Sequence, residues 1–209
     1  MRQRHGEPVG TAALWPPRGT GPVLTAAGAW LLAAVLVGAS GWFSTLRPPA
    51  PQLVLAGLTI ALLLAARLWP PLRQFMDTAD LRALVLFHVT RFVGFYFLAL
   101  HARGELPWAF AVPGGWGDNA VAAGALLLVL LVRPHSRRGR RAYLAWNIFG
   151  LLDILGVVLT AARLTLGDPA SMKALLELPL SLLVTFVVPI IIATHLLMLA
   201  RLARTAPGR

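Results

Sequence analysis

The residues able to do chemistry in this chain are a few charged and polar side chains that interrupt long apolar segments. Arg91 and Asp153 are formal charges of opposite sign that lie deep inside two such segments. At a rise of about 1.5 Å per helical residue, Arg91 lies about 12 Å and Asp153 about 15 Å from the same end of their helices. A lone charge in a bilayer interior costs about 2.5–3.5 kcal/mol. We therefore predict an Arg91–Asp153 ion pair, which serves either to fix the helix register or to form part of a functional site.

Three further polar side chains are expected near the same depth. His88 precedes Arg91 by three residues and so shares its helical face, while Asn147 and His195 lie in two other apolar segments. Two imidazoles that face each other could be the axial ligands of a b-type haem, hold a metal ion or relay protons. Hydrogen bonds from a histidine to a carbonyl or to Asn147 would account for the same pattern. No His-x-x-x-His or Glu-x-x-His spacing points to a metal site.

Asp118 follows a stretch rich in glycine and tryptophan, residues 106–119, which we expect to be an outer loop at the membrane interface. Asp118 would then be the N-cap of a short helix, where its carboxylate accepts backbone N–H bonds. A bent glycine loop could instead carry Asp118 inward towards Arg91. The predicted ligand-binding residues are Arg91, Asp118, Asn147, Asp153 and His195, and the alternative haem ligands are His88 and His195.

The elements that must position these residues are membrane-spanning helices. Of the 209 residues, 57% are hydrophobic and 13% are charged, whereas ordinary soluble domains carry about 25% charged residues. Crossing a bilayer takes about 20 apolar residues, so the short run at 120–132 could also be re-entrant. We predict an all-α integral membrane bundle of six transmembrane helices in a domain covering 22–203. The spans lie at about 23–43, 51–69, 83–100, 118–133, 143–162 and 178–200, between a flexible tail at 1–21 and a tail at 204–209.

The net charge of +11 indicates how the chain is oriented. With six spans, most arginines fall on one side of the membrane, which the positive-inside rule makes the cytoplasmic side, together with both termini. On this count Asp118 lies outside, and Arg91 cancels Asp153 in the interior. Nucleic-acid binding is excluded because no basic surface carries interleaved aromatic residues. Four arginines of one inner loop could bind anionic lipid headgroups or could serve only as a topogenic signal: Arg137, Arg138, Arg140 and Arg141.

Pro189 lies six residues before His195 in the last apolar segment. A proline inside a helix removes one backbone hydrogen bond, and the carbonyl that it frees could point into the same polar site. The chain has no cysteine, which excludes disulfides and thiolate metal sites.

Several short stretches carry a resemblance to known proteins, and they lie at 91–94, 106–107, 110–111, 113–118, 146–147, 150–153, 178–180, 188–189 and 195–196. Through them the chain resembles a group of small, uncharacterised bacterial membrane proteins of about six helices. The resemblance covers about 84–202 and leaves the first two spans unmatched. It implies a bacterial plasma membrane and no particular activity. Because His88 lies outside the matched stretches, the resemblance favours the polar site over the haem.

Three functions remain open at this point. The first is the binding or transport of a small polar or amphipathic ligand, or of protons, at the polar site. The second is a membrane b-type cytochrome with haem held by the two histidines. The third is a membrane-embedded enzyme acting on a lipid or isoprenoid, with Asp153 or Asp118 as acid and His195 as base. Nothing in the sequence supports soluble-hydrolase chemistry, since there is no Gly-x-Ser-x-Gly elbow, P-loop or dinucleotide fingerprint.

Overall fold

The computed structural model describes residues 19–134 and 136–204, and all regular secondary structure in these two ranges is helical. This confirms the predicted all-α class. The predicted tails fall largely outside the described residues, at 1–18 and 205–209. The α-helices are α1 (Thr20–Ala39), α2 (Ala50–Leu68), α3 (Pro70–Thr78), α4 (Leu81–Phe87), α5 (Gly94–Ala102), α6 (Trp108–Leu131), α7 (Arg137–Gly167) and α8 (Val188–Arg204). The tighter or wider turns are η1 (Trp42–Thr45), η2 (His88–Val93), η3 (Pro169–Leu176) and η4 (Leu183–Val187).

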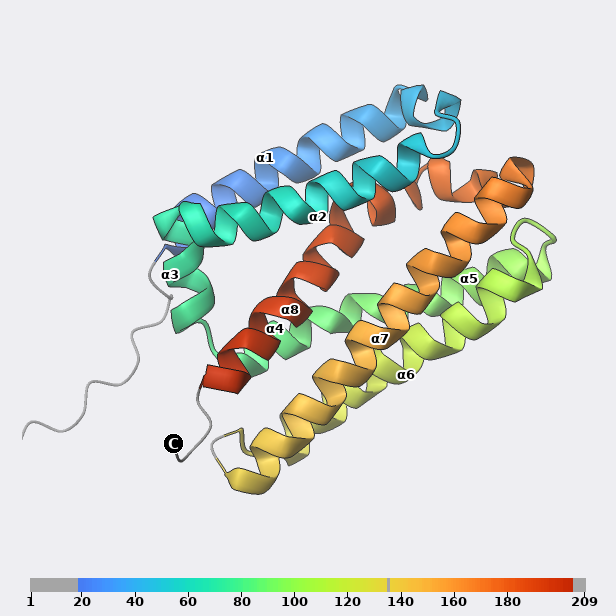
Figure 1. The fold of residues 1–209 in the computed structure, drawn as a ribbon. Helices are drawn as coiled ribbons and strands as arrows, with labels where there is room; N and C mark the ends of the chain where they lie inside the picture. Colours follow the sequence, from blue (N-terminus) through green and yellow to red (C-terminus); the bar gives the residue numbers. More distant parts are fainter. Residues whose placement is uncertain (1–18, 135, 205–209) are drawn as a thin grey trace, which may run out of the picture.

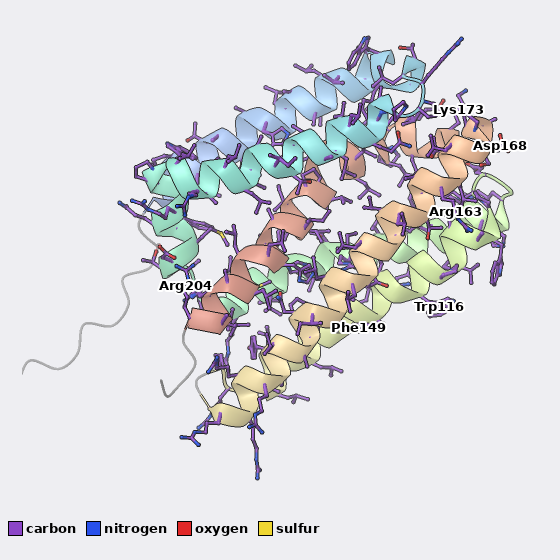
Figure 2. The ribbon with its side chains drawn as sticks, viewed as in Figure 1. Trp116, Phe149, Arg163, Asp168, Lys173 and Arg204 are labelled. Carbon is purple, nitrogen blue, oxygen red and sulfur yellow. The ribbon has the colours of Figure 1, made fainter. Side chains whose placement is uncertain are left out.

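Six helical stretches of the described chain are long and apolar enough to cross a membrane, as predicted. They are α1, α2, the continuous run α4–η2–α5, α6, α7 and the run η4–α8. Large apolar side chains, including Leu36, Leu130 and Leu152, remain exposed on the outside of the bundle. Trp116 of α6 and Phe149 of α7 are exposed in the same way and are labelled in Figure 2. An apolar outer surface of this extent is suited to lipid.

The fourth span differs from the prediction. The stretch expected to be an outer loop is the first half of α6, which begins at Trp108 and runs for 24 residues, long enough to cross a membrane. Pro113 and several glycines lie inside this helix. Glycine and proline are commoner in membrane helices than in soluble ones, because neighbouring helices satisfy the backbone groups that they disturb. Turn signals learned from soluble proteins are therefore misleading here.

Helix α6 lies at the centre of the half of the bundle that holds the polar residues. It packs against η2 and α5 on one side and against α7 on the other, and α8 packs in turn against α7 and α2. Fully buried small residues on α6, such as Ala111, Ala122 and Ala125, let these helices approach closely. The polar residues of four spans can therefore meet beside α6.

The basic segments of the chain gather at one end of the bundle. The start of α1, helix α3, the turn between α6 and α7, and the end of α8 all lie at that end, whereas η1, η3 and the α5–α6 turn lie at the other (Figure 1). This arrangement agrees with the predicted alternation of six spans. The cytoplasmic position of the basic end and of both termini stays a prediction.

Pro189 affects its helix in a different way from the one expected. The carbonyl that it frees, four residues earlier at Thr185, accepts a hydrogen bond of 2.9 Å from the indole Nε1 of Trp30 on α1. The interpretation that this carbonyl points into the polar site is therefore wrong. A wide π-helical turn, η4, immediately precedes the proline and accommodates the change. The Trp30 contact fastens α1 to the last span.

Candidate functional site

Arg91 is the centre of the site, and a break in the third span positions it. Between α4 and α5 the chain tightens into the 3₁₀ turn η2, which carries Arg91. Such turns within a helix often mark functional positions. The Arg91 side chain is 0% exposed and lies against α6 and α7, so all its donors must find partners within the protein.

Three nitrogens of the Arg91 side chain donate hydrogen bonds to acceptors on two neighbouring helices, α6 and α7. Its Nε donates to Oδ1 of Asp118 at 2.6 Å, and its Nη1 donates to the carbonyl oxygen of Gly150 at 2.8 Å. Its Nη2 donates to Oδ2 of Asp153, with which it forms an ion pair. The predicted Arg91–Asp153 ion pair is thus confirmed, and we name Arg91, Asp118 and Asp153 the charged cluster.

The predicted role of Asp118 as the N-cap of a helix is wrong. Asp118 lies in the middle of α6, whose N-cap is Pro107, so it caps no helix. Its carboxylate points into the bundle and pairs with Arg91. The cause is again the extended α6: once the glycine-rich stretch is helical, Asp118 moves from the membrane interface to the interior.

Two glycines make the room that the site needs. A Cβ atom on Gly117 would overlap the carboxylate of Asp153, and one on Gly150 would lie 2.6 Å from Cε1 of His195. Any other residue at these positions must displace a side chain of the site. Helices α6 and α7 can therefore carry their polar groups at this depth only because both positions are glycine.

The charge of the cluster is not balanced. One guanidinium faces two carboxylates, so with all three ionised the net charge is 1 − 2 = −1. The charges counted from the sequence placed Asp118 on the outer side of the membrane and gave the membrane interior a net charge of zero. An uncompensated charge inside a bilayer is costly, and one additional positive charge, either a proton or a cationic group, would remove it.

Only one member of the charged cluster reaches the surface of the bundle. The Arg91 and Asp118 side chains are 0% and 4% exposed, whereas that of Asp153 is 16% exposed. Asp153 lines a groove of about 230 Å³ between α6 and α7, together with Ala109, Pro113, Gly156 and Thr160, among others. Pro113, which interrupts the backbone hydrogen bonds of α6, also lines this groove. The groove lies between two candidate membrane spans, so a molecule in the bilayer could reach it.

A second group of polar residues, His88, Asn147 and His195, adjoins the first at Gly150. Asn147 Oδ1 lies 2.8 Å from Nδ1 of His195, and Asn147 Nδ2 donates to the His195 carbonyl at 3.0 Å. The rings of His88 and His195 lie with centroids 4.1 Å apart, and both contact the indole of Trp146. We name His88, Asn147 and His195 the histidine cluster.

The hydrogen bonds decide which nitrogen of each ring carries the proton. Asn147 Oδ1 only accepts, so Nδ1 of His195 is the donor and its Nε2 holds a lone pair. The single hydroxyl proton of Thr194 is donated at 2.7 Å to the carbonyl of Ile190, so its oxygen, at 3.3 Å, accepts from Nε2 of His88. The remaining nitrogens, His88 Nδ1 and His195 Nε2, are buried and have no partner in the described part of the chain. Two lone pairs thus remain inside the bundle.

The histidine cluster does not fit haem. Two axial imidazoles stand on opposite faces of a macrocycle with the iron between them. Here the rings touch at 4.1 Å and Trp146 packs against both of them, which leaves no space for a porphyrin. In the described ranges no group of three or more His, Cys, Asp or Glu side chains is placed to hold a metal ion. The bis-histidine interpretation of His88 and His195 is therefore not taken further.

The fold and the site together define a class, that of multi-pass α-helical membrane proteins with a buried charged cluster. The chain belongs to the family of a domain of unknown function, DUF8737, whose model matches residues 48–203. The match runs from just before α2 almost to the end of α8, so it includes both clusters and excludes α1. No curated protein and no solved structure compared with the chain is significantly similar to it.

The structure brings together the five residues predicted for the site, but as two neighbouring clusters. The sequence analysis missed Gly117 and Gly150, which make room for side chains, and Trp146, which packs on both imidazoles. It also missed Asn119, a buried amide next to Asp118 whose side-chain atoms have no partner among the described residues. Only Asn119 offered a signal, because it is a polar residue at the start of the predicted span 118–133.

Proposed function

We propose that this protein binds a small amphipathic ligand with a cationic head at Asp153, and that a proton occupies the carboxylate when the ligand is absent. The observation that carries the proposal is the asymmetry of the charged cluster. Arg91 and Asp118 are sealed inside the bundle, whereas Asp153 lines the groove between α6 and α7. A ligand in the bilayer can therefore reach one carboxylate without disturbing the other.

The charge of the cluster and the lining of the groove support a cationic head and an apolar tail. The cluster lacks one positive charge, which a cationic head in contact with Asp153 supplies. Beyond the carboxylate the groove is lined by Thr160 and otherwise by small or apolar residues. An anionic head would meet an already negative site, so the site discriminates by charge as well as by shape.

Labelling of the purified protein in mild detergent tests this proposal. Dicyclohexylcarbodiimide is an apolar reagent that modifies protonated carboxyl groups, and peptide mass spectrometry locates the label. We expect labelling of Asp153 and little labelling of Asp118. Dodecyltrimethylammonium should protect Asp153, whereas dodecyl sulfate, which has the same tail and an anionic head, should not.

A variant that fills the groove tests whether the reagent reaches Asp153 through the groove. A side chain at Gly156 grows into open space, so Gly156→Leu is expected to fill the groove without disturbing the fold and to lower Asp153 labelling several-fold. Unchanged labelling in Gly156→Leu, or equal protection by both detergents, would contradict the proposed entry and the proposed ligand class.

A second function, proton relay, is favoured by the two lone pairs of the histidine cluster. His88 Nδ1 and His195 Nε2 are buried acceptors on touching rings, and Gly150 separates them from Arg91. Protein in vesicles with an imposed pH difference should then pass protons, and His88→Phe should abolish the flux. Equal flux for both proteins would eliminate the relay. The contacts of His195 are with Asn147, His88 and Trp146, so nothing favours the acid–base pair that a lipid-modifying enzyme would need.

A further inference from the structure

A second polar cavity lies at the basic end of the bundle, well away from the charged cluster. It has a volume of about 550 Å³ and is formed by α2, α3 and α8. Its polar lining consists of four arginines and one acid: Arg67, Arg73, Asp77, Arg201 and Arg204. Arg204 is labelled at the end of α8 in Figure 2. Four guanidinium groups and one carboxylate give the cavity a charge of 4 − 1 = +3.

The arginines converge in space although they are far apart in the sequence. Arg67 ends the second span, Arg73 lies on α3, and Arg201 and Arg204 lie in the last turns of α8. The positive-inside rule requires basic residues on one side of the membrane, but it does not require them to line one cavity. Arg201 also donates to the carbonyls of Met76 and Ala79, at 3.3 and 2.6 Å, and so fastens the end of α3 to α8. The cavity is therefore a built feature of the fold.

The walls of this cavity continue into apolar surface. Met76 and Leu197 line it and also line a separate apolar cavity of about 430 Å³ between α1, α2, α3, α4 and α8. Helix α3 buries Leu72 and Met76 and exposes Arg73 and Asp77, which is the pattern of a helix that lies in the membrane interface. A position of α3 in the interface would place these arginines at the level of lipid phosphates, directly beside a place for an acyl chain.

We propose that this cavity binds the phosphate headgroup of an anionic phospholipid, with an acyl chain against Met76 and Leu197. Guanidinium groups pair with phosphate oxygens through two parallel N–H bonds, and several of them together can hold a doubly charged headgroup. Basic pockets between membrane helices are known to hold anionic lipid headgroups. The site is independent of the charged cluster and of its proposed ligand.

The test compares lipids that differ only in their headgroup. The purified full-length protein in mild detergent is titrated with short-chain phosphatidic acid, with phosphatidylcholine of the same chains and with inorganic phosphate, and binding is followed by thermophoresis. We expect phosphatidic acid to bind at least tenfold more tightly than either of the other two. Equal binding of phosphatidylcholine would overturn the headgroup site, and equal binding of inorganic phosphate would overturn the lipid as its occupant.

Matched arginine variants distinguish the cavity from general surface charge. Arg67→Gln with Arg204→Gln removes two exposed arginines of the cavity, and should weaken phosphatidic acid binding on the order of 30-fold, from about 1 kcal/mol for each basic residue. Arg137→Gln with Arg138→Gln makes the same charge change at exposed positions of the same end of the bundle. An equal loss in both double variants would show diffuse attraction and overturn the proposal. Arg73→Gln, also exposed, provides an independent variant in the cavity.

Discussion

The charge imbalance of the charged cluster leads to a prediction that runs against ordinary expectation for an ion pair. Neutralising Arg91 should destabilise the protein severely, whereas neutralising either carboxylate should be well tolerated. Arg91→Met leaves Asp118 and Asp153 facing each other inside the bundle with no base between them. Removing one partner of a buried ion pair typically costs about 3–5 kcal/mol of folding free energy, and here two acids lose their partner at once.

The carboxylate variants should be less destabilising than Arg91→Met, because each removes one of the two acids that the single Arg91 must balance. With all three groups ionised the cluster carries −1, and in the ligand-free protein we propose that a proton on Asp153 removes this charge; Asp153→Asn or Asp118→Asn makes the cluster neutral without that proton and leaves one intact Arg91 ion pair. The loss of a hydrogen bond to a charged group, about 1.5–3 kcal/mol, is then offset because the variant needs no bound proton to be neutral. We expect a net change of about 1 kcal/mol or less for each single variant.

Thermal unfolding in mild detergent, followed by tryptophan fluorescence, measures these differences. Arg163→Met is the matched control, because Arg163 is exposed near the far end of α7 (Figure 2) and its removal should leave the unfolding temperature unchanged. The triple variant with Arg91→Met, Asp118→Asn and Asp153→Asn should recover most of the stability lost in Arg91→Met. If Asp153→Asn destabilises the protein as much as Arg91→Met does, the charge count does not govern the cluster and the reasoning is refuted.

Two further predictions concern packing around the site. Trp30→Phe removes the donor to the carbonyl that Pro189 leaves free, and should cost about 1–3 kcal/mol because a buried acceptor loses its partner; in a Pro189→Ala background, which restores a backbone N–H, thermal unfolding should show a smaller loss. Gly117→Ala should displace the Asp153 carboxylate and lower the free energy of unfolding by about 1–3 kcal/mol. Gly156→Ala, on the same groove but with open space around its Cβ, should leave that free energy unchanged or raise it by up to about 1 kcal/mol, and an equal loss in the two variants would refute the steric argument.

The number of spans and the central ion pair could be predicted from the sequence because both follow from the cost of polar groups in lipid. Apolar runs of membrane length leave little choice of structure, and Arg91 needed an acid at its own depth. The role of Asp118 could not be found in this way. Its position depends on whether the stretch before it is helix or loop, and Pro113 with its neighbouring glycines indicates a loop in water while it is tolerated in a membrane helix.

Other features could not be predicted from the sequence because they depend on how the helices pack in three dimensions. The sequence suggested that His88 and His195 lie at one level, but it gave no distance between the rings, and the 4.1 Å contact is what excludes haem. Gly117 and Gly150 make room for Asp153 and His195, but nothing in the sequence distinguishes them from other glycines in a span. Their role depends on the position of the neighbouring helix. The arginine-lined cavity likewise depends on how α3 folds back against α8.

The charged cluster also bears on the order in which the spans are inserted into the membrane during synthesis. Arg91 belongs to the third span, and its partners Asp118 and Asp153 belong to the fourth and fifth. During synthesis the third span emerges alone with a charge that its own helix cannot neutralise, at a cost of about 2.5–3.5 kcal/mol in lipid. We expect this cost to delay the release of the third span until the next two have been made. These three spans would then pack together early, whereas α1, held to the last span by Trp30, completes its packing only when that span has been made.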